Sequence, residues 1–157
     1  MWITPSRLPR YNLKSGDLVK VNLTTGKTKG RNNPSIEWEM HLNIYNSSNT
    51  KAIVHCHSPY TLGVCISSRF DHVIEEARIV VGNPAIIKNY PSGSKELAVN
   101  VARCFENNDI RAVIIKNHGV VAIGENIDQA RAVVESLEEW AKILTVSKIF
   151  GGPLSRL

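Results

Sequence analysis

The chain has 157 residues, which is the size of one ordinary domain and enough to enclose a hydrophobic core. Apolar residues make up 43% and charged residues 21%, the composition of a soluble globular protein. The formal charge of +5 comes from scattered basic residues, which form no block and do not alternate with aromatic residues. Nucleic-acid binding is therefore not expected.

The cysteines and the hydropathy pattern point to the cytoplasm. Cys56, Cys65 and Cys104 form no CxxC pair, and an odd, widely spaced set argues against a disulfide framework. No apolar run approaches the roughly 18 residues of a membrane span. The first five residues lack the layout of a signal peptide. We expect a cytoplasmic protein with no membrane association.

The first third of the chain predicts a loop, a strand and a helix. Residues 4–16 carry prolines and a glycine and read as a loop, whereas residues 18–23 alternate as a half-buried strand does. A turn and a polar loop over residues 29–34 follow. Ser35 is a plausible N-cap, so a helix is predicted over residues 36–47.

The rest of the chain predicts strands interspersed with amphipathic helices. Residues 67–80 carry no clear pattern. The predicted elements are, in order, a strand over residues 52–57, a mildly helical stretch over 60–66, a strand over 85–87, a helix capped by Ser94 and carrying apolar residues from Leu97 to Phe105, strands over 112–115 and 120–123, and a helix over 127–149. These elements indicate one domain over residues 1–157, with a mixed, largely antiparallel sheet covered by helices.

His55-Cys56-His57 is the most informative short motif. Alternate side chains of a strand point to one face, so both imidazoles can reach one ion while Cys56 points into the core. A catalytic zinc ion takes three protein ligands, and His118 is the best third candidate because it ends another predicted strand, beside a glycine that permits a tight turn. Taken alone, the motif is also compatible with ordinary surface or core histidines.

Glu37 is the second candidate for chemistry, in the first turn of the predicted helix. A carboxylate beside the ring of Trp38 and near a metal can have its pKa tuned for proton transfer. The local sequence by itself favours a solvated glutamate that is stabilised by the helix dipole. His41, one turn further along, is interpreted as a packed residue rather than a ligand.

Five segments together carry a family resemblance. They are Ile3-Thr4-Pro5-Ser6, Asp17-Leu18-Val19-Lys20-Val21, Pro34-Ser35-Ile36-Glu37-Trp38-Glu39-Met40-His41, Val54-His55-Cys56-His57-Ser58-Pro59-Tyr60 and Lys116-Asn117-His118-Gly119-Val120-Val121-Ala122-Ile123-Gly124. In this order and spacing the chain resembles the class II aldolase/adducin family, and most of all its fuculose-phosphate aldolase branch. The match runs over nearly the whole chain, and the ordered set is far more specific than any single segment.

The resemblance implies a fold, a cofactor and a reaction. The fold is a three-layer α/β/α domain around a mostly antiparallel sheet, assembled as a homotetramer with active sites at subunit interfaces. Zn²⁺, or another divalent transition metal, is held by His55, His57 and His118, and acts as a Lewis acid. Glu37 moves protons at the substrate carbon. The reaction is cleavage of a ketose 1-phosphate, such as L-fuculose 1-phosphate, to dihydroxyacetone phosphate and an aldehyde.

The chain departs from the family pattern in its expected phosphate site. The family has a helix and a glycine-rich segment before the first motif, and this chain is expected to lack them. Arg7 occupies a position where the family usually has a glycine. Ile36 occupies a position where the family has a serine that commonly binds the phosphate. We expect Ser6, Arg7 and Ser35 to bind it, with the Arg7 guanidinium replacing lost contacts. The catalytic tyrosine that the family takes from a neighbouring subunit has no clear counterpart in residues 67–83.

Three functions follow from the resemblance. A zinc-dependent sugar-phosphate lyase is the leading hypothesis. Methylthioribulose-1-phosphate dehydratase is the second. It uses the same histidines and glutamate, so only the substrate distinguishes it from the lyase. A non-catalytic oligomeric protein like the adducin branch is the third, and the retained histidines and Glu37 argue against it.

Overall fold

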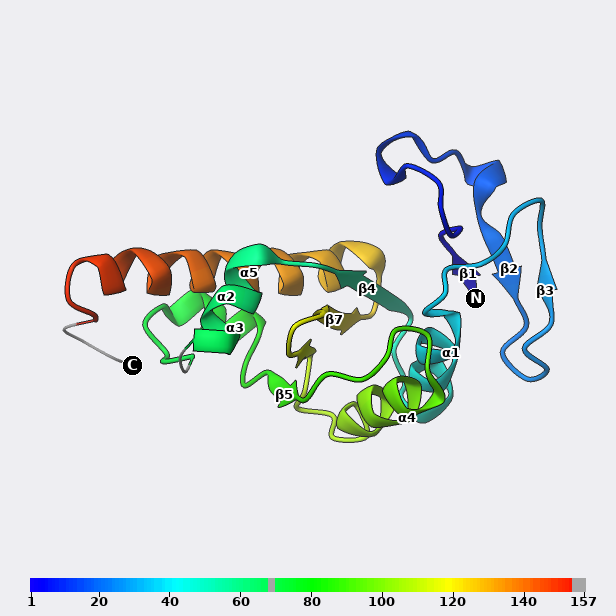
Figure 1. Cartoon of the computed structure of the whole chain (residues 1–157). Coiled ribbons are helices and arrows are strands. Elements are labelled where there is room, and N and C mark those ends of the chain that lie inside the picture. Colours follow the sequence, from blue (N-terminus) through cyan, green and yellow to red (C-terminus); the bar gives the residue numbers. More distant parts are fainter. Residues whose placement is uncertain (68–69, 154–157) are drawn as a thin grey trace. The chain divides into compact units, whose positions relative to one another are not determined.

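A computed structural model describes residues 1–67 and 70–153. Contacts between residues divide the chain into two compact units (Figure 1). Unit 1 contains Met1–Asn49 and Tyr90–Arg103, and unit 2 contains Thr50–Asn89 and the described part of Cys104–Leu157. The first unit carries the N-terminal motifs of the sequence and the second carries the three candidate metal ligands.

Unit 1 combines a small sheet with two helices. Its antiparallel strands lie in the order β1 (Trp2–Ile3), β2 (Val19–Val21), β3 (Thr28–Lys29), and its helices are α1 (Trp38–Ser47) and α4 (Lys95–Cys104), whose last residue falls in unit 2. Single turns of 3-10 helix occur at η1 (Arg10–Asn12) and η2 (Ser15–Asp17). Ile3, Val19 and Val21 form a buried cluster, against which Met1 and Trp38 pack. The alternating strand pattern therefore buries one face, as the sequence predicts.

Unit 2 is built on a four-stranded sheet in the order β4-β7-β6-β5. The strands are β4 (Ala52–Cys56), β5 (Ala85–Ile87), β6 (Ala112–Ile115) and β7 (Gly119–Gly124). β7 pairs antiparallel with both β4 and β6, whereas β5 and β6 are parallel because the chain between them crosses over through α4. The expected mixed α/β class with mostly antiparallel strands is confirmed.

Three helices pack with this sheet in unit 2. They are α2 (Pro59–Ser67), α3 (Glu75–Val80) and α5 (Ile127–Ile149), and α5 contacts β4, β7, α2 and α3 (Figure 1). The core between them includes Ile114, Val120, Leu137, Trp140 and Leu144, which are all buried. The apolar stripe of α5 therefore faces the sheet, which explains why this helix has the bounds that its periodicity predicts.

One predicted helix boundary needs correction. The helix predicted from residue 36 begins at Trp38, and Ser35 is not its N-cap, because its hydroxyl instead accepts from the Glu37 amide at 3.3 Å in the preceding turn. In the segment without a clear pattern, residues 75–80 form α3, while residues 68–69 lie outside the described part. Within the described residues no helix has the length and apolar character that spanning a bilayer requires.

Candidate functional site

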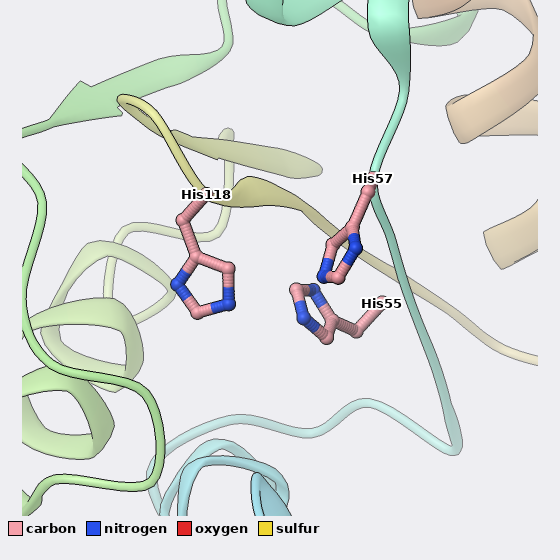
Figure 2. Close-up of side chains that lie close together, drawn as sticks. All are labelled: His55, His57 and His118. Atoms are coloured by element: carbon pink, nitrogen blue, oxygen red, sulfur yellow. The ribbon is translucent and has the colours of Figure 1, made fainter.

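The three predicted metal ligands come together in unit 2. His55 is the last but one residue of β4, His57 follows that strand, and His118 directly precedes the neighbouring strand β7 (Figure 2). Their ring centroids are 5.3 to 5.6 Å apart. One ligand nitrogen from each residue lies within 4.8 Å of the others. Two neighbouring strands thus turn a local His-x-His motif and a distant histidine into one cluster.

Gly119 provides the room for this cluster. A Cβ at this position would lie 2.6 Å from the Cys56 carbonyl oxygen and 2.9 Å from ring carbons of both His55 and His57. In the tight turn before β7, the residue with the left-handed conformation is Asn117, with φ of 58°. Gly119 is therefore needed because any side chain would occupy the space of two imidazoles.

The environment of the rings suits metal binding. The Nδ1–H of His55 donates to the Val120 carbonyl oxygen at 2.9 Å, which leaves Nε2 with its lone pair as the ligand atom. Burial lowers the pKa of His118, which favours its neutral, metal-binding form. His57 is the exposed member of the cluster, whereas the other two histidines are partly buried. A set of three imidazoles fits Zn²⁺ with an open coordination position.

The register between β4 and β7 explains why the Val120 carbonyl is the hydrogen-bond partner of His55. Cys56 lies opposite Val120 in the antiparallel pair of β4 and β7, so the Val120 carbonyl is close to the end of β4. Sequence reasoning missed this contact because pairing between distant strands is not readable from local patterns. Cys56 itself packs against the core of unit 2, as its predicted orientation requires.

Glu37 is a buried carboxylate in unit 1, only 5% exposed. Its Oε1 accepts a hydrogen bond from the Gly93 amide at 3.1 Å. Gly93 has φ of 72°, and a Cβ there would approach the Ile36 carbonyl oxygen to 3.1 Å. The solvated glutamate favoured by the local sequence is therefore wrong, because a segment 56 residues further along the chain covers this side chain.

The three expected phosphate-binding residues lie on two adjacent segments of unit 1. The Ser6 amide donates to the Asn33 carbonyl and the Ser35 amide donates to the Thr4 carbonyl, each at 3.0 Å. These bonds flank an antiparallel bridge between Pro5 and Pro34. Ser6 and Ser35 therefore flank the same bridge, one on each of two paired segments that are distant in the sequence.

Arg7 follows this bridge in a strained conformation. Its φ is 62°, in the left-handed region that glycine adopts freely and other residues adopt at a cost. Its side chain is exposed. Glycine would adopt this backbone angle without strain.

The two other histidines lie outside the cluster. The Nδ1–H of His41 donates to the Glu37 carbonyl oxygen at 2.9 Å, and burial lowers the pKa of this imidazole. The Nε2–H of His72 donates to Asn83 Oδ1 at 2.8 Å, and its ring lies 4.7 Å from that of Trp140. His41 is a packed helix residue, as predicted.

Comparison with known proteins gives consistent matches over most of the chain. A family described as "Class II Aldolase and Adducin N-terminal domain" matches residues 1–145. An L-fuculose phosphate aldolase of Methanococcus maripaludis is 37% identical over 145 residues, covering 91% of this chain and 77% of the relative. A 5-deoxy-D-ribulose 1-phosphate aldolase of Bacillus thuringiensis is 35% identical over 155 residues, covering 96% and 71%.

A solved structure extends the likeness to three dimensions. A structure named L-fuculose 1-phosphate aldolase superposes with a TM-score of 0.87 at 33% identity, covering 99% of this chain and 73% of that one. The similarity therefore includes both the sequence motifs and the arrangement of the elements.

Proposed function

Because the chain belongs to the class II aldolase and adducin family, we propose that it cleaves a ketose 1-phosphate by a metal-dependent aldol reaction. The observation that carries this proposal is the cluster of His55, His57 and His118 around Gly119. The names of the relatives support a 1-phosphorylated ketose as substrate, either L-fuculose 1-phosphate or 5-deoxy-D-ribulose 1-phosphate. The first would give dihydroxyacetone phosphate and lactaldehyde.

In this proposal the three imidazoles hold Zn²⁺. A closely spaced set of nitrogen ligands suits zinc, and also accepts Co²⁺, Mn²⁺ or Fe²⁺. When bound, a divalent cation supplies Lewis acidity to the carbonyl and hydroxyl oxygens of the substrate. The protein's own contribution is the orientation of the ligands, through the His55 hydrogen bond and the space that Gly119 leaves.

Glu37 is proposed as the acid/base. Aldol cleavage breaks the bond between C3 and C4 of the ketose; the C4 hydroxyl loses its proton as it becomes the aldehyde, and C3 gains a proton to give dihydroxyacetone phosphate. A single carboxyl group can return that proton to C3. The burial of Glu37 and its hydrogen bond from Gly93 support the role, because they fix the carboxylate and shield it from water.

Ser6, Arg7 and Ser35 are proposed to bind the substrate phosphate. Their support is the bridge between Pro5 and Pro34, which the two serines flank, and the exposed Arg7 that follows it in the chain. Guanidinium groups bind phosphate in a bidentate manner, which gives orientation as well as affinity. Replacing Arg7 by alanine should therefore raise KM for the sugar phosphate, and an unchanged KM would remove Arg7 from the site.

The assembly and location are proposed from the family resemblance. We expect a cytoplasmic homotetramer with active sites at the subunit interfaces. No disulfide joins the three cysteines in the part of the chain that the structure describes, which suits a reducing compartment. Light scattering of the purified protein tests the tetramer, and a monomeric mass with full activity would contradict it.

The deciding experiment combines metal content with product release. Wild type should contain one divalent metal per chain and release dihydroxyacetone phosphate from one of the two ketose phosphates. Glu37→Gln should retain the metal and lose activity by about a hundredfold or more. Glu39→Gln is the matched control, because it removes a nearby carboxylate from the first turn of α1, the helix that Glu37 precedes.

The other outcomes identify the competing functions. Loss of water from methylthioribulose 1-phosphate, without release of dihydroxyacetone phosphate, would indicate the dehydratase. Bound metal without turnover of any of these sugar phosphates would favour a non-catalytic, adducin-like protein. Wild-type protein without any bound metal would refute the proposed site.

A further inference from the structure

His57 is the metal-ligand candidate with the least direct support from the sheet. β4 ends at Cys56 and α2 begins at Pro59, so His57 and Ser58 form the corner between a strand and a helix. His57 is exposed, whereas the other two ligand candidates are partly buried. The direction of its imidazole therefore depends on what holds this corner in place.

Glu138 of α5 holds the helix side of the corner. Its carboxylate accepts hydrogen bonds from the amides of Tyr60 and Thr61 at 3.1 and 2.9 Å, and from the Thr61 hydroxyl at 2.8 Å. The first amides of a helix have no partner within the helix, and Pro59 has no amide hydrogen to satisfy. A carboxylate is also favoured at this end by the helix dipole. Glu138 thus caps α2 from another element of the fold.

The rest of the corner is tied to the same elements. The Leu62 amide donates to the Ser58 carbonyl oxygen at 3.0 Å, and Ser58 is buried beside Cys56, with 3.3 Å between the hydroxyl and the thiol. Helix α5 packs against both β4 and α2. Glu138 and His57 line one hollow of about 580 Å³. Glu138, which accepts hydrogen bonds from the start of α2, therefore lines the same hollow as the candidate ligand His57.

We propose that Glu138 is a positioning residue that sets the direction of His57 for metal binding. It acts through the backbone of the corner and not by contact with the metal or substrate. Because ligand orientation before binding lowers the cost of forming a metal site, loss of Glu138 should weaken metal affinity. This inference rests on the proposed function of the histidine cluster and adds the device that preorganises it.

Co²⁺ binding to the metal-free full chain tests the proposal. Glu138→Gln keeps the size of the side chain but turns an amide NH₂ toward the donors of α2. We expect the dissociation constant for Co²⁺ to rise about tenfold and the visible absorption of bound Co²⁺ to change. Hydrogen exchange at the Tyr60 and Thr61 amides of the metal-free protein should accelerate.

Glu135→Gln is the matched control. Glu135 lies on the same helix and lines the same hollow, but its carboxylate pairs with Arg131 at 2.8 Å. This variant should bind Co²⁺ like wild type. A purely structural cap would lower the melting temperature of Glu138→Gln while leaving the Co²⁺ affinity and spectrum unchanged, and that result would overturn the proposal.

If Glu138→Gln does not fold, a second variant tests the same positioning role. Thr61→Val removes only the hydroxyl bond to Glu138 and keeps both amide bonds, so Co²⁺ affinity should fall about threefold. Unchanged affinity in Thr61→Val would overturn the positioning role. Wild-type protein that binds no Co²⁺ would instead overturn the proposed metal site, together with the inference that rests on it.

Discussion

Gly119→Ala should disrupt the candidate metal site at its centre. An alanine Cβ would lie 2.9 Å from carbons of both His55 and His57 and 2.6 Å from the Cys56 carbonyl oxygen. Carbon atoms pack at roughly 3.5 Å or more, so each ring has to move by about 0.6 Å. Metal–ligand distances tolerate only about 0.2 Å, so the substitution should weaken Zn²⁺ or Co²⁺ binding by about 10- to 100-fold. The strain should also destabilise the metal-free protein by about 1–3 kcal/mol.

Gly63→Ala is the matched control for this substitution. Gly63 is on α2 in the same unit, and a Cβ there meets nothing within 4 Å. Alanine should therefore be neutral or stabilise the helix by up to about 1 kcal/mol. Calorimetric titration with Co²⁺ and thermal unfolding of the metal-free proteins measure both effects. Wild-type metal affinity in Gly119→Ala would refute the argument that this glycine makes room for the rings.

Three further predictions concern stability. Arg7→Gly should stabilise the protein by about 1 kcal/mol in chemical denaturation, because glycine adopts φ of 62° without strain, and it should raise KM for the sugar phosphate. Burial lowers the pKa of His41 below that of the unfolded chain, so the melting temperature of the metal-free protein should fall as pH drops below about 6.5, and less steeply in His41→Gln. Ser94→Ala should cost about 1 kcal/mol, because the Ser94 hydroxyl accepts from the Leu97 amide at 3.1 Å at the start of α4.

Elements with a strong local signal were predictable from the sequence. The apolar run of β6 is buried at every position, and α5 combines a sustained helical period with an N-cap at Asn126. The His-x-His motif was readable for the same reason, because side-chain alternation in β4 is a local property. The start of α1 was misplaced because the Ser35 side chain satisfies the Glu37 amide within a turn rather than capping the helix.

Features that depend on distant contacts were not predictable. The burial of Glu37 requires Gly93, which the sequence gives no reason to place beside it. The orientation of His55 requires the register of β4 against β7. Glu138 looks like one of several carboxylates on α5, and only the fold distinguishes it as the acceptor for the start of α2. Local patterns together with the family resemblance thus identified the candidate groups, and tertiary contacts determine how those groups are held.

Arg7 connects backbone strain with the proposed phosphate site. The bonds from Ser6 to Asn33 and from Ser35 to Thr4 fix the chain just before Arg7, so its left-handed conformation is imposed by its neighbours. A strained, exposed arginine gains nothing from burial to offset this cost, and strain of this kind concentrates at functional sites. A ligand contact made by the guanidinium would supply the missing compensation. Greater stability of Arg7→Gly without any change in KM would show that the strain has no functional counterpart.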